Sequence, residues 1–160
     1  MSRQADVNGK NVSALTFREA YLIINKHINS GVALKDLRKM GLFIPAAVNC
    51  AFSCEMFLKS FINNATLESL KIHKLSDLFE TLKDETKDII INNMLAKMGN
   101  GYSEQKFYTD LADNSNAFVD WRYFYEKSNH YSKHFMDCFL ESLFKFSSDY
   151  NVGHDPNPDY

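Results

Sequence analysis

Apolar residues recur every three or four positions along most of the chain, which is the spacing of one face of an α-helix. No stretch alternates apolar and polar residues for long enough to predict a β-strand. We therefore predict an all-α fold, an antiparallel bundle of four to five helices with short connections.

Capping and stop signals predict where the helices begin and end. Thr16 and Glu19 have the spacing of a capping box and predict the start of a first helix that ends near Ser30. The apolar face of this helix continues through Ala20, Ile23, Ile24 and Ile28. Pro45 suits the first turn of a second helix to Asn63, because a proline has no N–H to leave unpaired there. Further elements are expected as a short turn at 34–40 and helices at 75–82, 84–98, 103–125 with a break at 113–116, and 130–146.

The helix after Pro45 carries one apolar stripe whose first half consists of small residues. Its members are Ile44, Ala47, Val48, Ala51, Cys54, Leu58, Phe61 and Ile62. Small side chains let another helix approach closely, so we expect a tightly packed partner helix on this face.

The length and composition predict one domain. A chain of 160 residues with 45% hydrophobic residues is of ordinary single-domain size. We expect the bundle over residues 13–148, with a flexible polar arm at 1–12. Residues 149–160 are expected to form a flexible tail, because they carry turn and breaker residues with little to bury.

The charge and the cysteine content limit the possible binding partners and the cellular compartment. The net charge of −2 excludes a global basic field, so any contact with nucleic acid must be local. We find no signal peptide and no run of about 18 uncharged apolar residues, and expect a cytoplasmic protein that does not span a membrane. The odd count of three cysteines predicts reduced thiols at Cys50, Cys54 and Cys138 rather than a disulfide framework.

Two segments carry a recognisable pattern. The first is the small-residue helix over 44–61, with Glu55 and Lys59 in a Glu-x-x-Leu-Lys arrangement, followed by His73 in a His-x-Leu-x-x-Leu segment. The second is a Trp-Arg-Tyr-x-x-Glu run from Trp121 to Glu126. In order and spacing, over about residues 15 to 147, the two resemble the HEPN family (higher eukaryotes and prokaryotes nucleotide-binding domains).

The resemblance implies a helical bundle that commonly pairs as a homodimer and needs no cofactor. Its members act as metal-independent endoribonucleases or as non-catalytic modules associated with nucleotides or RNA. Many belong to toxin–antitoxin, phage-defence or RNA-processing systems, which also suggests a cognate partner protein. The ligand-binding candidates on this basis are Glu55, Lys59, His73, Trp121, Tyr123 and Tyr125.

The nuclease members of that family carry an Arg followed four to six residues later by a His. In this chemistry His acts as general acid or base, and Arg stabilises the charge that develops on the phosphate. Here Arg122 and His130 have seven residues between them, about 12 Å along an unbroken helix. A break at 128–129 would allow them to meet, with Glu126 orienting Arg122 and His134 as a substitute base. The structural alternative is an ion pair between Arg122 and Glu126, one helical turn apart.

Other candidate residues have structural explanations. His130, His134 and Cys138 recur every four residues and, with Cys50 and Cys54, offer zinc-type ligands, but we expect a half-buried helix face and no metal. Glu55 and Lys59 suit a one-turn ion pair. We expect His73 to bond a backbone carbonyl or cap a helix.

Aromatic residues are concentrated between residues 102 and 125. They are Tyr102, Phe107, Tyr108, Phe118, Trp121, Tyr123, Phe124 and Tyr125. So many aromatics on several faces predict a subunit interface, with base stacking as the alternative. The interface is favoured because few Lys and Arg residues are interleaved with them.

Three functional hypotheses follow. The first is a HEPN-like domain associated with nucleotide or RNA, without nuclease activity, in a bacterial defence or toxin–antitoxin setting. The second is a metal-independent endoribonuclease that uses Arg122 and His130. The third is a helical scaffold or adaptor that binds only protein. Whether the protein is an enzyme is left open by the sequence, because fold analogy alone does not determine function.

Overall fold

The computed structural model describes residues 3–30, 36–62, 71–116 and 131–153, and within these ranges every regular element is a helix. The prediction of an all-α fold is confirmed. The helices are α1 (Arg3–Ile28), α2 (Asp36–Phe61), α3 (Leu75–Glu80), α4 (Asp84–Met98), α5 (Glu104–Asp113) and α7 (Lys133–Gly153).

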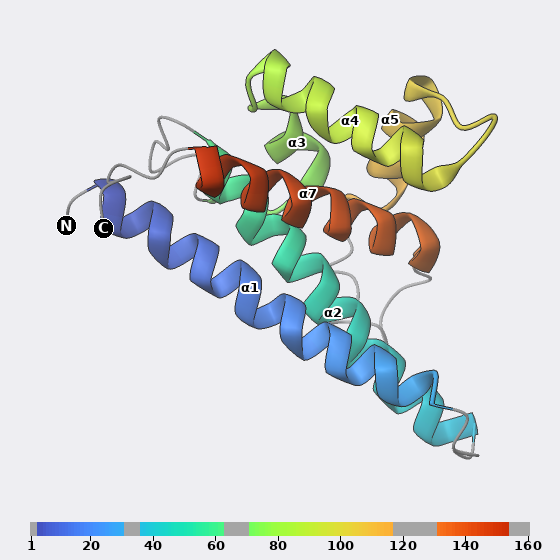
Figure 1. The fold of residues 1–160 in the computed structure, drawn as a ribbon. Coiled ribbons are helices and arrows are strands. Elements are labelled where there is room, and N and C mark those ends of the chain that lie inside the picture. Colours follow the sequence, from blue (N-terminus) through green and yellow to red (C-terminus); the bar gives the residue numbers. More distant parts are fainter. Residues whose placement is uncertain (1–2, 31–35, 63–70, 117–130, 154–160) are drawn as a thin grey trace.

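The helices α2 and α7 form the middle of the molecule, with α1 on one side and α3, α4 and α5 on the other (Figure 1). The two longest helices, α1 and α2, have 26 residues each and lie side by side in opposite directions. By contrast α2 and α7 run in the same direction (Figure 1). The bundle is therefore not wholly antiparallel, because the chain crosses back over α3, α4 and α5 before α7 begins.

The small-residue face of α2 is the centre of the core, as the stripe predicted. Ala47, Cys50, Ala51 and Cys54 are buried, and the Cys50 thiol lies 3.7 Å from the Met136 carbonyl oxygen of α7, whereas α1 packs on the side of α2 that carries Ser53. The Ser53 hydroxyl donates to the Ala14 carbonyl of α1 at 2.7 Å, a contact that only a close helix approach permits.

Polar contacts fix α1 against α7. The Arg18 guanidinium donates to both carboxylate oxygens of Glu141, at 2.9 and 3.1 Å. The Tyr21 hydroxyl donates to Asp137, which also accepts from the Lys133 ammonium at 2.6 Å. Burial and the hydrogen bond to Asp137 raise the pKa of Tyr21 well above its ordinary value, so Tyr21 stays a donor at any physiological pH.

Two predicted helix starts are wrong. The first helix begins at Arg3 and not at Thr16, so residues 3–12, expected to precede it, are helical. The Thr16 hydroxyl donates to the Val12 carbonyl one turn back instead of capping a helix end. Pro45 lies inside α2, which is continuous from Asp36, at the cost of the backbone bond that a proline cannot donate to Gly41.

The glycine and serine signals correctly predicted the end of α4 and the start of α5. The helix α4 spans the predicted residues and ends before Gly99 and Gly101, whose φ angles of +87° and +89° favour glycine. The Ser103 hydroxyl caps α5 by accepting from the Lys106 amide at 3.2 Å. The last helix begins at Lys133 and reaches Gly153, beyond the predicted end at Phe146.

The described aromatic residues of the 102–125 region make contacts within the chain. Phe107 is fully buried, with its ring centroid 5.2 Å from that of Phe79. Tyr108 also packs against Phe79, and the Tyr102 hydroxyl donates to Asp110 at 2.9 Å. Phe107 is therefore a core residue, because α3 and α7 supply an aromatic core that receives α5, and the subunit interface stays a prediction for the partly buried Tyr102 and Tyr108. The other five lie outside the described residues.

The segment Gly41–Phe61 of α2 is long and apolar enough to cross a membrane by length and composition alone. Half of its most apolar window is buried inside the fold, and it carries the charged pair of Glu55 and Lys59. The core helix of a folded domain has the same properties.

Phe107→Ala is expected to lower the free energy of unfolding by about 3–5 kcal/mol, because it leaves a cavity among buried rings. Ile89→Ala on α4, where 47% of the side chain is exposed, is expected to cost less than about 0.5 kcal/mol. Urea denaturation measures both. Similar losses in the two variants would contradict the assignment of the core.

Candidate functional site

Glu55 is a buried carboxylate in the last two turns of α2. Its exposed fraction is 1%, and the neighbouring Cys54, Phe57 and Leu58 are fully buried. Such a charge is costly unless it is compensated. The Lys59 ammonium, one turn further on and itself 6% exposed, donates to Glu55 Oε1 at 2.7 Å. The predicted ion pair of Glu55 and Lys59 is confirmed, in the order of acid before base that suits a helix.

His73 reaches the same carboxylate from the segment before α3. Its Nδ1 lies 3.0 Å from Glu55 Oε1, and 52% of its side chain is exposed. We expected a backbone carbonyl or a helix end as the partner and did not anticipate a carboxylate. The Glu-x-x-Leu-Lys helix and the His-x-Leu segment therefore meet at Glu55.

The second oxygen of this carboxylate is incompletely satisfied. Glu55 Oε2 is buried, and no residue in the described ranges donates a hydrogen bond to it. A buried acceptor without a donor is unfavourable by about 1–3 kcal/mol. The site therefore has the capacity to accept one more N–H or O–H donor, from a water molecule or a ligand.

Asn114 and Ser115 connect this site to the chain on both sides of residues 117–130. The Leu75 amide donates to the Ser115 carbonyl at 3.0 Å, and the Ser76 amide donates to the Ser115 hydroxyl at 2.9 Å. Asn114 Oδ1 accepts from the Ser132 amide at 2.8 Å. The residues that precede and follow segment 117–130 are thus held together beside α3.

This anchor lies close to His73. Leu75 follows His73 by two positions along the chain, so their Cα atoms are at most about 7 Å apart. We predicted only a break at 113–116 and missed the anchoring role of Asn114 and Ser115. The available signal was the run of Asn and Ser after a helix, whose side chains commonly bond nearby backbone.

Six of the predicted site residues lie outside the described residues. They are Trp121, Arg122, Tyr123, Tyr125, Glu126 and His130. The catalytic pair of Arg122 and His130 and the ion pair of Arg122 with Glu126 remain predictions.

The side chains considered for zinc do not gather in the described part of the chain. No group of three or more His, Cys, Asp or Glu residues there could hold a metal ion. His134 is exposed and Cys138 half-buried on α7, whereas Cys50 and Cys54 are buried free thiols. Burial raises the pKa of Cys54 well above its ordinary value, so it is a neutral thiol.

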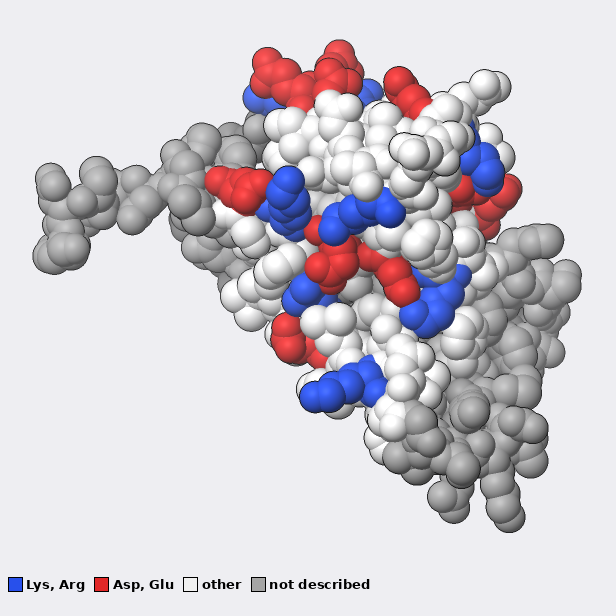
Figure 2. Space-filling model, turned by 45° about the vertical axis from the view of Figure 1, so that its right-hand side comes forward, with Lys and Arg blue, Asp and Glu red and all other residues white. Residues whose placement is uncertain are grey.

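The charged side chains give no extended basic surface on the face shown in Figure 2, where Lys and Arg alternate with Asp and Glu. This distribution agrees with the net charge of −2. A polyanion approaching this face would meet both signs of charge within a few residues. Binding of a phosphate backbone would therefore depend on a small number of positioned side chains.

Lys59→Met is expected to lower the free energy of unfolding by about 3 kcal/mol, because it leaves the Glu55 charge buried and uncompensated. Glu55→Gln combined with Lys59→Met removes both charges and is expected to recover at least half of that loss. Chemical denaturation of the parent protein, of Lys59→Met and Glu55→Gln singly, and of the double variant measures the difference. A loss in the double variant as large as the sum of the two single variants would contradict a coupled buried pair.

The chain was compared with known proteins. No protein-family model matches it, and neither does any solved structure. A stretch of 74 residues, 46% of the chain, is 35% identical to part of the chromatin-remodeling ATPase INO80 of Saccharomyces cerevisiae. The matched stretch spans 5% of the length of that ATPase. A similarity of this extent does not show a family.

Proposed function

We propose that the chain is a HEPN-like helical domain that associates with RNA or nucleotides and does not cleave RNA. The observation that supports this most is the contact of Glu55 with both Lys59 and His73. This contact brings together the Glu-x-x-Leu-Lys helix and the His-x-Leu-x-x-Leu segment, two of the sequence patterns that resemble the family. Because many members of that family act in bacterial defence or toxin–antitoxin systems, we propose that setting here.

The geometry at His73 suits contact with a phosphate or a base edge. A carboxylate bonded to one imidazole nitrogen holds the ring in a fixed orientation. Lys59 neutralises the charge of Glu55, so the half-exposed imidazole is presented without a strongly negative group at the surface. A histidine held in this way can donate to a phosphate oxygen or to a base.

Arg122 is the residue that we propose to contact phosphate, because it belongs to a segment whose two ends lie beside α3. Its segment, 117–130, leaves and re-enters the described body at Asn114 and Ser132, beside the start of α3. This segment also carries Trp121, Tyr123 and Tyr125, and aromatic rings are suited to stack on bases. We propose that Arg122 contacts phosphate and that these rings contact bases.

The absence of cleavage follows from spacing. The resemblance implies that nuclease members separate Arg and His by less than Arg122 and His130 are separated here. General acid–base catalysis needs the His within hydrogen-bond reach of the reacting hydroxyl while Arg contacts the same phosphate. If one unbroken helix joined Arg122 to His130, the pair would lie about 12 Å apart and would not meet that condition, whereas the predicted break at 128–129 would allow them to meet.

The association is tested with a labelled single-stranded RNA of mixed sequence, in EDTA, by fluorescence anisotropy at several salt concentrations. His73→Ala and Arg122→Ala are each expected to weaken binding about fivefold or more, and Arg122→Ala also to reduce the salt dependence. The matched controls are His27→Ala and Lys145→Ala, which remove an exposed His of α1 and an exposed Lys of α7. Both are expected to bind within about twofold of the parent protein.

The same samples, run on a denaturing gel, test for cleavage. We expect intact RNA in every lane. Cleavage that disappears in His130→Ala would replace this proposal with the endoribonuclease hypothesis. No binding even at low salt would contradict association with RNA and favour a protein scaffold.

A further inference from the structure

An asparagine that precedes a glycine or a serine can lose its side-chain amide without an enzyme. The backbone nitrogen of the next residue attacks the side-chain carbonyl carbon, and a small next residue leaves room for this attack. Four asparagines in the described ranges precede a glycine or a serine: Asn8, Asn29, Asn100 and Asn114. Each of them reacts only if its side chain and the next backbone amide are free to approach each other.

Asn8 and Asn114 are held by their surroundings. Asn8 lies inside α1, so the Gly9 amide takes part in the backbone hydrogen bonds of the helix. Asn114 is buried, and its side-chain nitrogen donates to the Asp110 carbonyl at 2.8 Å. The Ser115 amide donates to the carbonyl three residues before it at 3.2 Å. At both positions a hydrogen bond must therefore break before the attack can take place.

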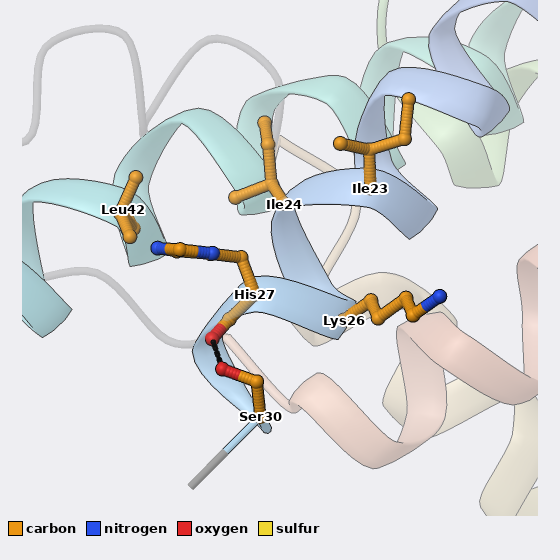
Figure 3. Close-up of a pocket in the computed structure, with 6 residues that line it drawn as sticks. All are labelled: Ile23, Ile24, Lys26, His27, Ser30 and Leu42. Carbon is orange, nitrogen blue, oxygen red and sulfur yellow. Dashed lines mark hydrogen bonds between the residues drawn. The ribbon is translucent and has the colours of Figure 1, made fainter. Parts of the chain in front are cut away.

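Asn29 is exposed, but both of its reacting groups are bonded. Its side-chain nitrogen donates to the Asn25 side chain at 3.3 Å, and the Ser30 amide donates to the His27 carbonyl at 3.3 Å. The Ser30 hydroxyl donates to the same carbonyl at 2.8 Å, and Figure 3 shows this bond at the end of α1. Exposure alone therefore does not make an asparagine of this chain free to react.

Asn100 is both exposed and unrestrained. It lies between α4 and α5, where Gly99, Asn100 and Gly101 are all exposed. The Tyr102 amide donates to the Gly99 carbonyl at 3.3 Å, which makes Asn100 and Gly101 the central residues of a β-turn. Among the described residues, none is hydrogen-bonded to the Asn100 side chain or to the Gly101 amide. Gly101 has a φ of +89° and no side chain to hinder the approach of the asparagine.

We propose that Asn100 is a site of spontaneous deamidation, with water as the co-reactant. The Gly101 nitrogen gives its proton to solvent base and attacks Asn100 Cγ, which closes a succinimide ring. The bond from Cγ to the side-chain nitrogen breaks, and that nitrogen takes up a proton and leaves as ammonia. Water then opens the ring at either carbonyl and gives aspartate or isoaspartate. Nothing is oxidised or reduced in these steps.

Both products change the connection between α4 and α5. A carboxylate at position 100 lies just beyond the C-terminus of α4, where a negative charge is unfavourable, and Lys97 is an exposed base in the last turn of that helix. Isoaspartate also lengthens the main chain by one carbon atom at the turn. The isoaspartyl form is therefore a substrate for the class of enzymes that methylate isoaspartyl carboxylates. This proposal does not depend on the association with RNA.

The test incubates the full-length protein in mildly alkaline buffer and follows each asparagine by peptide mapping with mass spectrometry. In the folded protein we expect Asn100 to react about tenfold or more faster than Asn8, a difference of at least about 1.4 kcal/mol in activation free energy. Both precede a glycine, so Asn8 is the matched control. In guanidinium chloride, which removes the helix, the two are expected to react at similar rates. Mildly acidic buffer is expected to slow the reaction, because the attacking nitrogen must lose its proton.

Asn100→Gln is the matched variant, because glutamine has one more carbon and closes the corresponding ring far more slowly. We expect it to remove the acidic species that isoelectric focusing resolves in the incubated parent protein. An Asn100 that stays intact in the folded protein would overturn the proposal, whatever the unfolded protein shows. Equal rates at Asn8 and Asn100 in the folded protein, or a faster loss at Asn29, would also overturn it.

Discussion

The buried carboxylate of Glu55 is the constraint on which the arrangement of the site depends. An ionised group at 1% exposure needs a positive partner and hydrogen-bond donors, and the chain provides Lys59 from the next turn and His73 from the segment before α3. The contact with Lys59 lies within one turn of α2 and follows from the helix itself. The contact with His73 places the start of α3, two positions further on, beside α2. The partnerless Oε2 leaves the site one donor short within the described ranges.

The small-residue face of α2 makes this arrangement possible. Cys50, on the small-residue face, contacts α7, which runs along α2 in the same direction, while α1 packs on the side of α2 that carries Ser53. The helix α3 packs against α2 beyond the contact of His73 with Glu55, and α5 packs against α3. Ser115 then links α5 to α3, which places both ends of segment 117–130 beside the site.

Helix ends and ion pairs that depend on residues within one helical turn could be predicted from the sequence. Contacts between residues far apart in the sequence could not. The end of α4 at Gly99, the Ser103 cap and the pair of Glu55 with Lys59 each depend on residues within one helical turn. The start of α1 was missed because Thr16 and Glu19 match a capping box equally well inside a helix, and because Asn8-Gly9 is a turn signal that the helix nevertheless includes. The contact of His73 with Glu55 spans 18 positions, and no local pattern encodes it. Helical spacing likewise could not tell that Ile23 faces outward while Ile24 packs inward.

The central claim is that the group formed by Glu55, Lys59 and His73 belongs to the surface that contacts RNA. The most direct measurement is an NMR titration of the protein, labelled at its histidine rings and backbone amides, with a short single-stranded RNA. We expect the His73 ring signals and the amides of 73–76 and 114–116 to shift in proportion to bound RNA, and the His27 ring signals to stay unchanged. Shifts confined to α1, or none at saturating RNA, would contradict this claim.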